Sequence, residues 1–354
     1  GRVKNSGMVT VPMGRVGFAA GERVTLDLSG DQFLQVALPS DVGDDMDALI
    51  ENTGTVSAEG GLIEMRAAAA RAAARNAINL SGVAEARSVS GRSGAIVLGG
   101  SGGNVSVSGR VSTRARDPIV TSSLRPRARG GDITVTGTRI ALEGAVIDAS
   151  GQSGGGLIRV GGDFAGKGPL PRARQVTVDA DTHLAADGGV SGNGGRIAIW
   201  SDRQTHFNGT MSARGGETGG VGGFIEVSSA QELRYRGFAD LRANSGAWGT
   251  LLLDPADISV PGTIDEATLE AGLEAGNFTL DTFDEFGTDP GDITIDVDVD
   301  WGASTRLSLT ADRNVFLNGA INGPNGELNI DVGNLIVAGN PDADVNVDRF
   351  LLES

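Results

Sequence analysis

Two neighbouring stretches decide the fold of this chain: GGRIAIWSDRQTHFNGTMSARGG at residues 194–216 and GGFIEVSSAQELRYRGFADLRANSG at residues 222–246. Each opens with a pair of glycines and continues with alternating apolar and polar residues. This alternation is the period of a β-strand that buries one face. A second glycine-containing turn and a second short apolar run follow in both stretches. The two stretches therefore predict short strands separated by tight turns.

The same phrase recurs along the chain, which predicts a repeat architecture. Neighbouring copies are offset by roughly 25–40 residues. Strands this short cannot bury a face alone, but coils stacked on one another bury a continuous core. We therefore expect an all-β fold, a right-handed parallel β-helix (β-solenoid) with extruded loops and one or two short helices as an open alternative. The earlier copies of the phrase lie at 52–65, 80–98, 102–115 and 130–151.

The alternation also predicts which side chains point inward, and the turns predict a role for glycine. Glycine pairs, and the Asn-Gly pairs at 208–209, 318–319, 322–323 and 325–326, are expected to supply positive φ in turns. A small alanine in Gly-x-hydrophobic-x-Ala suits a tight corner. The residues expected to point inward are Ile133, Val135, Ile197, Ile199, Ile225 and Val227, and those expected to point outward are Thr134, Ala198 and Glu226.

The regularity of the repeat changes after residue 260, which predicts three segments. Residues 1–260 are expected to form a first repeat block that ends at the LLLDP motif within GTLLLDPADISV (249–260). Residues 261–290 read as an irregular or short helical connector. Residues 291–354 read as a second, truncated block. The alanine-rich run at 65–78 is compatible with a helix or with an extruded loop, and the sequence leaves both open.

Composition excludes several classes of protein. The chain has 354 residues, 56 of them glycine, and only 4% aromatic residues, so its core must be thin and aliphatic. There is no cysteine, which excludes cysteine nucleophiles and thiolate metal sites. The net charge of -16 argues against nucleic acid or an anionic membrane as a partner. No apolar run approaches the roughly 20 residues that a membrane-spanning helix needs.

Several motifs in order resemble the exoproteins of bacterial two-partner secretion, the filamentous-haemagglutinin-like adhesin family. They are the Asn-x-Gly-x-hydrophobic-x-Ala-x-Gly-Gly run at 52–61, GGRIAIWSD, FNGTMSARGGETGGVGGFIEVSS, GTLLLDPADISV and the pair ITIDVDVDW and LSLTADRNVFLNGAI. The resemblance covers nearly the whole chain. It implies a secreted protein of the bacterial outer cell surface, exported through an outer-membrane barrel transporter. We interpret the chain as a middle section of such a protein.

Candidate metal and catalytic residues have simpler structural explanations. The only histidines, His183 and His206, are not at ligand spacing, so zinc is not expected. The cluster Asp289, Asp292, Asp296, Asp298 and Asp300 suggests calcium, but the last three alternate and read as the solvated outer face of a strand. Polysaccharide cleavage needs paired carboxylates on one groove, and no aromatic sugar platform accompanies them here. We expect no enzyme, no catalytic residue and no cofactor.

One cluster of positive charge stands out in this acidic chain, and it is our predicted binding site. It lies in and beside a predicted extruded loop at 112–130, and a second candidate binding loop lies at 163–175. The leading hypothesis is a non-catalytic rod that adheres to cells, glycans or biofilm matrix through a surface receptor or glycan. The alternatives are a stalk or end-to-end self-assembling fibre and, third, a polysaccharide lyase or hydrolase. The cluster comprises Arg110, Arg114, Arg116, Arg125, Arg127 and Arg129.

Overall fold

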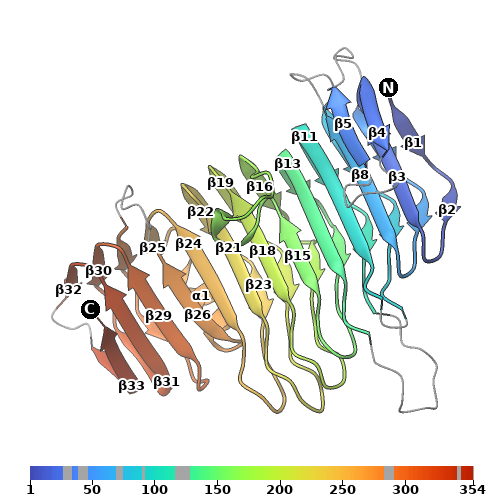
Figure 1. Cartoon of the computed structure of the whole chain (residues 1–354). Helices are drawn as coiled ribbons and strands as arrows, with labels where there is room; N and C mark the ends of the chain where they lie inside the picture. The colour runs from blue at the N-terminus through green and yellow to red at the C-terminus, as the bar shows by residue number, and fades with distance from the viewer. Residues whose placement is uncertain are drawn as a thin grey trace.

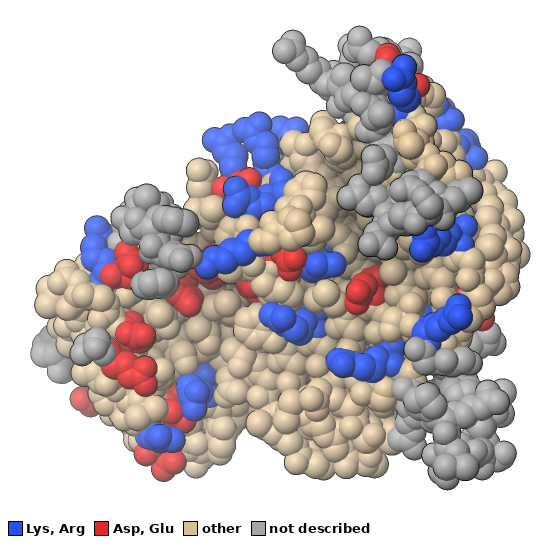
Figure 2. All heavy atoms as spheres, in the orientation of Figure 1, with Lys and Arg blue, Asp and Glu red and all other residues tan. Residues whose placement is uncertain are grey.

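The chain is wound into a parallel β-helix, a rod with its N-terminus at one end and its C-terminus at the other (Figure 1). The computed structural model describes residues 1–26, 34–38, 47–68, 75–89, 92–115, 128–282, 291–340 and 344–353. Side chains of both charges are interspersed over the face seen in Figure 2. The stacking of parallel strands confirms the predicted all-β solenoid.

The coils contribute strands to three faces, and most strands pair in parallel with their counterparts on the neighbouring coils. Four long strands bend around a corner and serve two faces: β11 (Ala95–Val107), β13 (Asp132–Leu142), β31 (Ile321–Val332) and β33 (Val345–Glu353). Face I also holds β3 (Arg15–Ala20), β8 (Leu62–Ala68), β15 (Leu157–Val160), β18 (Arg196–Ser201), β21 (Phe224–Ser229), β24 (Thr250–Pro255), β26 (Asn277–Asp281) and β29 (Arg306–Ala311).

The other two faces are built from shorter strands. Face II holds β1 (Val3–Asn5), β6 (Ala48–Asn52), β9 (Asn76–Leu80), β16 (Gln175–Val178), β19 (Gln204–Phe207) and β22 (Glu232–Tyr235), then β25 (Ile258–Val260), β27 (Ile293–Ile295), β30 (Asn314–Leu317) and β32 (Leu335–Ala338). Face III holds β2 (Met8–Thr10), β7 (Thr55–Ser57), β10 (Val83–Glu85), β12 (Arg110–Ser112), β14 (Val146–Asp148), β17 (His183–Ala185), β20 (Thr210–Ser212), β23 (Phe238–Asp240) and β28 (Val299–Asp300). An antiparallel hairpin, β4 (Arg23–Leu26) with β5 (Leu34–Leu38), lies beside the first coils.

The core is a continuous column of aliphatic side chains, as the composition predicts. All six residues predicted to point inward are completely buried. The alanines of the Gly-x-hydrophobic-x-Ala pattern at Ala58, Ala86 and Ala213 are also completely buried. The few aromatic rings serve packing: Phe207 and Tyr235 stack on successive coils with ring centroids 5.4 Å apart.

Thr134, Ala198 and Glu226, which the alternation predicts to point outward, are nevertheless shielded from solvent. Their exposed fractions are 5%, 1% and 2%. The segment between β15 and β16 folds back over this part of face I, and its short 3-10 helix η1 (Phe164–Gly166) packs against β18. The amide of Ala165 donates to Glu226 Oε1 at 2.8 Å. The alternation therefore gives the correct inward residues but cannot show which outward residues a later loop covers.

The reason predicted for the glycines is correct at some pairs and wrong at others. Positive φ is found, as predicted, at Gly60, Gly102, Gly154, Gly161 and Gly220. Gly195, Gly223 and the glycines of the four Asn-Gly pairs do not have positive φ. They are required because coils approach closely: a methyl group at Gly223 would lie 2.1 Å from the carbonyl oxygen of Gly195. A methyl group at Gly319 would lie 1.9 Å from the carbonyl oxygen of Val297. Glycine recurs at these positions because any larger residue would prevent the coils from stacking this closely.

The segment 261–290 holds a helix, but the sheet runs through it. Helix α1 (Glu266–Leu273) takes the place of a face III strand, beside β23 and β28, and Asp265 caps its first turn by accepting from the amide of Thr268. On face I, β26 pairs with both β24 and β29. Residues 65–68 of the alanine-rich run belong to β8, and β9 begins at Asn76; residues 69–74 lie outside the described part of the chain.

Candidate functional site

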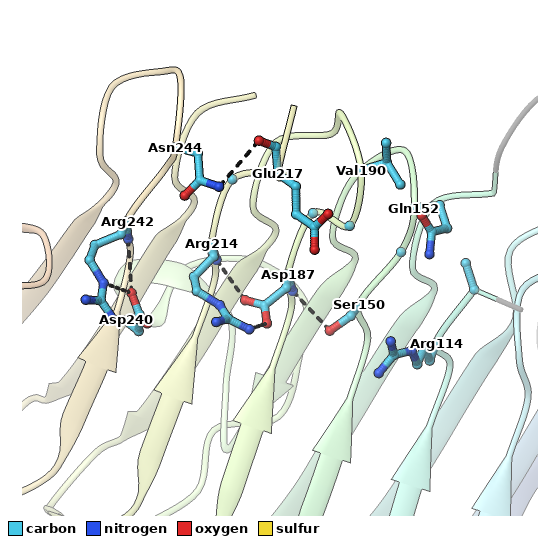
Figure 3. A pocket seen from close by; sticks show the side chains of 15 residues that line it. Arg114, Ser150, Gln152, Asp187, Val190, Arg214, Glu217, Asp240, Arg242 and Asn244 are labelled. Atoms are coloured by element: carbon cyan, nitrogen blue, oxygen red, sulfur yellow. Dashed lines mark hydrogen bonds and ion pairs between the residues drawn. The ribbon is translucent and has the colours of Figure 1, made fainter. Parts of the chain in front are cut away.

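The turns that follow face III enclose a groove of about 730 Å³ across consecutive coils (Figure 3). The ends of the face III strands form its floor, and the turns after β14, β17, β20 and β23 form its wall. Glycines make up part of the wall, because these turns also stack closely on one another. The lining residues are Arg114, Ala115, Ser150, Gly151, Gln152, Asp187, Gly188, Gly189, Val190, Arg214, Gly215, Glu217, Asp240, Arg242 and Asn244.

A column of polar side chains runs along the floor of this groove, one from each coil. The column follows from main-chain pairing: Gly151 donates to Asp187 O at 2.9 Å, and Gly188 donates to Arg214 O at 2.8 Å. Parallel coils stack about 4.8 Å apart, so the side chains of the column are neighbours. In order along the rod the column reads Arg114, Ser150, Asp187, Arg214 and Arg242.

The charges of the groove compensate one another. Arg214 Nη2 lies 2.9 Å from Asp187 Oδ2, and Arg242 Nη2 lies 2.7 Å from Asp240 Oδ2. Asp187 also accepts from the main-chain amide of Arg214 at 2.8 Å and from Ser212 Oγ at 3.1 Å. Carboxylates held in this way are fixed acceptors, and the groove presents a nearly neutral, hydrogen-bonding floor.

The lowered pKa of Asp240 is unlike that of a general acid. Burial alone would raise the pKa of Asp240, but the hydrogen bonds and charge of Arg242 hold this pKa below its ordinary value. A general acid needs the opposite shift, towards neutral pH. Burial does raise the pKa of Glu226, yet this side chain lies under the η1 segment and does not line the groove.

The predicted arginine cluster is only partly described, and its described members do not form one patch. Arg116, Arg125 and Arg127 lie outside the described residues. Arg110 lies 3.7 Å from both Glu85 and Asp148, and Arg114 lies 3.4 Å from Asp148. Arg129 lines a different hollow. Arg110 and Arg114 are therefore brought together but paired with acids, whereas Arg129 is apart from them.

The hollow that contains Arg129 lies between the C-terminal end of the first predicted binding loop and the N-terminal end of the second. Its volume is about 540 Å³. Phe164, from the second loop, lines it together with Arg196, whose guanidinium carbon lies 3.9 Å from the centre of the Phe164 ring. This contact is a cation–π interaction. The structure thus places residues of both loops, among them Arg129 and Phe164, around a single cavity.

The aspartates considered for calcium form hydrogen bonds between coils. Asp296 accepts from Asn318 and Asp300 accepts from Asn322, each at 2.6 Å, while Asp298 accepts from the amide of Ala320 at 2.7 Å. Asp289 lies outside the described residues. Within the described ranges, no group of three or more acidic or histidine side chains is arranged to hold a metal ion.

Sequence reasoning missed the acidic and basic residues of the groove floor, namely Asp187, Arg214 and Arg242. A signal for them exists in the repeat, because the floor residue follows a small or apolar residue that is buried, as in Ala186-Asp187, Ala213-Arg214 and Leu241-Arg242. Aligning the copies on that buried residue would have placed these side chains in one column.

No family model matches the chain, and no curated protein matches it. Within the described residues, no helix has the length and apolar character needed to cross a membrane. The function must therefore be argued from the fold and the groove.

Proposed function

We propose that this chain is a non-catalytic surface rod that binds extended ligands, such as cell-surface glycans or biofilm matrix, along the groove beside face III. The observation that carries this proposal is the groove floor: one polar side chain per coil, on consecutive coils, with each acid held by an arginine. A linear polymer repeats its polar groups along its length, and a solenoid repeats its side chains along its axis.

Secretion and attachment to the bacterial outer cell surface are part of the same proposal. They rest on the resemblance of the repeat to the two-partner secretion exoproteins, in which an outer-membrane barrel transporter is the export partner. The parallel β-helix is the architecture that this resemblance implies. Binding residues of repeat proteins are typically presented on one face or in the loops of the array, which agrees with a groove walled by turns.

A binding experiment with matched variants tests the proposal. Purified protein is applied to a glycan array and to bacterial and host cells, beside a groove variant with Arg114→Gln, Arg214→Gln and Arg242→Gln. The control variant carries Arg75→Gln, Arg87→Gln and Arg306→Gln, which also removes three paired, surface arginines. We expect the groove variant alone to lose binding. Equal binding by all three proteins, or by none, contradicts the assignment of the groove.

The same samples test for catalysis. Incubation with polysaccharides, followed by measurement of new reducing ends and unsaturated products, separates a binding rod from a lyase or hydrolase. Product formation that the groove variant abolishes would replace the binding proposal with an enzymatic one.

A second candidate, an end-to-end fibre, is favoured by exposed apolar side chains on the last and first strands of the array. Leu335, Phe350 and Leu352 are more than half exposed on β32 and β33, and Met8 is 77% exposed on β2. Strand edges with exposed apolar residues promote pairing with another chain. Sedimentation velocity over a range of concentrations tests it: growth into rods of increasing length supports a fibre, and a single species opposes it.

A further inference from the structure

A second basic cluster lies at the corner between face I and face II, away from the groove. Arg139, Arg174 and Arg203 line a hollow of about 300 Å³, and all three are exposed. Figure 2 shows blue side chains gathered at the upper edge of the rod, near the labels of β16 and β19 in Figure 1. The three arginines are far apart in the sequence, and only the stacking of coils brings them together.

Main-chain pairing holds these arginines on consecutive coils. The amide of Arg203 donates to Arg174 O at 3.2 Å, and the amide of Arg174 donates to Thr138 O at 2.8 Å, next to Arg139. Stacked positions are about 4.8 Å apart. Like charges at neighbouring positions are destabilising, so the arrangement carries an electrostatic cost that a bound anion would remove.

The acids near this cluster are already engaged elsewhere. Among the described residues, no carboxylate lies within ion-pair distance of Arg139, Arg174 or Arg203, in contrast to the paired arginines of the groove. Asp202, beside Arg203 in the sequence, pairs with Arg172 at 2.9 Å. Glu232 lines the far end of the hollow, where it accepts from Gln204 Nε2 at 2.8 Å.

A row of side-chain amides extends the cluster along face II. Gln175 Nε2 donates to Gln204 Oε1 at 3.1 Å, and Gln204 donates on to Glu232. The row has the same one-per-coil spacing as the arginines, because Gln175, Gln204 and Glu232 are register partners on β16, β19 and β22. Planar amides and guanidinium groups therefore line one continuous strip of the surface.

We propose that this strip binds a carboxylate-bearing polysaccharide, whose carboxylates contact the arginines. The guanidinium fork matches a carboxylate in shape and charge. The arginines repeat along the strip at the stacking distance of the coils, about 4.8 Å, so an extended polymer that carries carboxylates along its length can contact more than one of them. The amides of Gln175 and Gln204 supply hydrogen bonds to hydroxyl groups. The chain carries a net charge of -16, so most of its surface repels anions. The arginine strip is a local exception to this repulsion.

The test measures binding of the full chain to polygalacturonate, with heparin as a sulfated polymer and dextran as a neutral one. The cluster variant carries Arg139→Gln, Arg174→Gln and Arg203→Gln; the control variant is the Arg75→Gln, Arg87→Gln, Arg306→Gln protein, which loses the same charge. We expect polygalacturonate to bind the native and control proteins, and the cluster variant to bind it about tenfold to a hundredfold more weakly. Salt should weaken binding, since screening shortens the reach of exposed charges.

The outcomes identify which kind of anionic polymer the strip binds. Binding of polygalacturonate but not dextran, lost in the cluster variant alone, supports the proposal. Tighter binding of heparin than of polygalacturonate replaces carboxylate with sulfate and overturns the stated ligand. Equal binding by cluster and control variants, or equal binding of a single-stranded oligonucleotide of matched charge, also overturns it. This inference adds a site to the binding function proposed above, and the groove variant distinguishes the two, because it leaves the cluster intact.

Discussion

A single methyl group at Gly223 tests the stacking of coils most directly. In Gly223→Ala the new carbon would lie 2.1 Å from the carbonyl oxygen of Gly195 on the preceding coil, well inside an ordinary contact. That oxygen also accepts the ladder hydrogen bond from the amide of Phe224 at 3.1 Å. The two coils must therefore separate locally, and the hydrogen bond must lengthen or break.

The expected magnitude combines two costs. Adding a methyl group to a tightly packed site costs about 1–3 kcal/mol, and weakening one hydrogen bond adds about 0.5–1.5 kcal/mol. We therefore expect Gly223→Ala to destabilise this region by about 2–4 kcal/mol. Gly219→Ala is the matched control, because nothing lies within 4 Å of its added methyl group. Replacing glycine at an open site changes stability by less than about 1 kcal/mol.

Hydrogen–deuterium exchange and guanidinium unfolding, followed by far-UV circular dichroism, are the appropriate assays. Long repeat arrays can unfold locally, so a local destabilisation changes the global unfolding midpoint only slightly. Exchange of the amides in β18 and β21 measures the local destabilisation directly. We expect faster exchange in both strands of Gly223→Ala and no change in Gly219→Ala. If the two variants exchange and unfold alike, close approach is not the reason for the glycine repeat.

Three further predictions concern single side chains. Tyr235→Phe removes a buried hydroxyl that has no hydrogen-bond partner in the structure and should raise stability by about 1 kcal/mol; a lower guanidinium midpoint would contradict this. Burial raises the pKa of Glu226 above its ordinary value of 4.5, so its contribution to stability is complete below pH 4.5 and is lost as pH rises through the raised pKa. Glu226→Gln should therefore raise the guanidinium unfolding midpoint at neutral pH, with the gain shrinking in acid; a constant gain would refute the linkage. The hydrogen bond from Arg313 lowers the pKa of Asp292, so Asp292→Asn should slightly destabilise the C-terminal coils at neutral pH, since exposed ion pairs contribute little. The difference should vanish as pH falls through the lowered pKa; an unfolding difference that persists in acid would count against it.

The positions of the arginines in the proposed sites could not be predicted from the sequence. A run of nearby arginines predicted one basic site, but Arg110 and Arg114 are paired with acids of neighbouring coils. Arg139, Arg174 and Arg203 are dispersed in the sequence, yet they line one hollow. Ion pairs and clusters across coils depend on register, and loops of different length between the strands hide that register in the sequence.

The sequence by itself determined the parallel β-helix, the inward residues and the corner alanines, because each depends on a short period within one coil. Only the tertiary structure decided which outward side chains are covered, why glycine recurs and which charges meet. Glu226 is buried by a segment that lies 61 residues away in the sequence, and Gly223 must be glycine because of a carbonyl oxygen on another coil. Both are contacts between coils, and their geometry is set by the stacking distance and not by any local pattern.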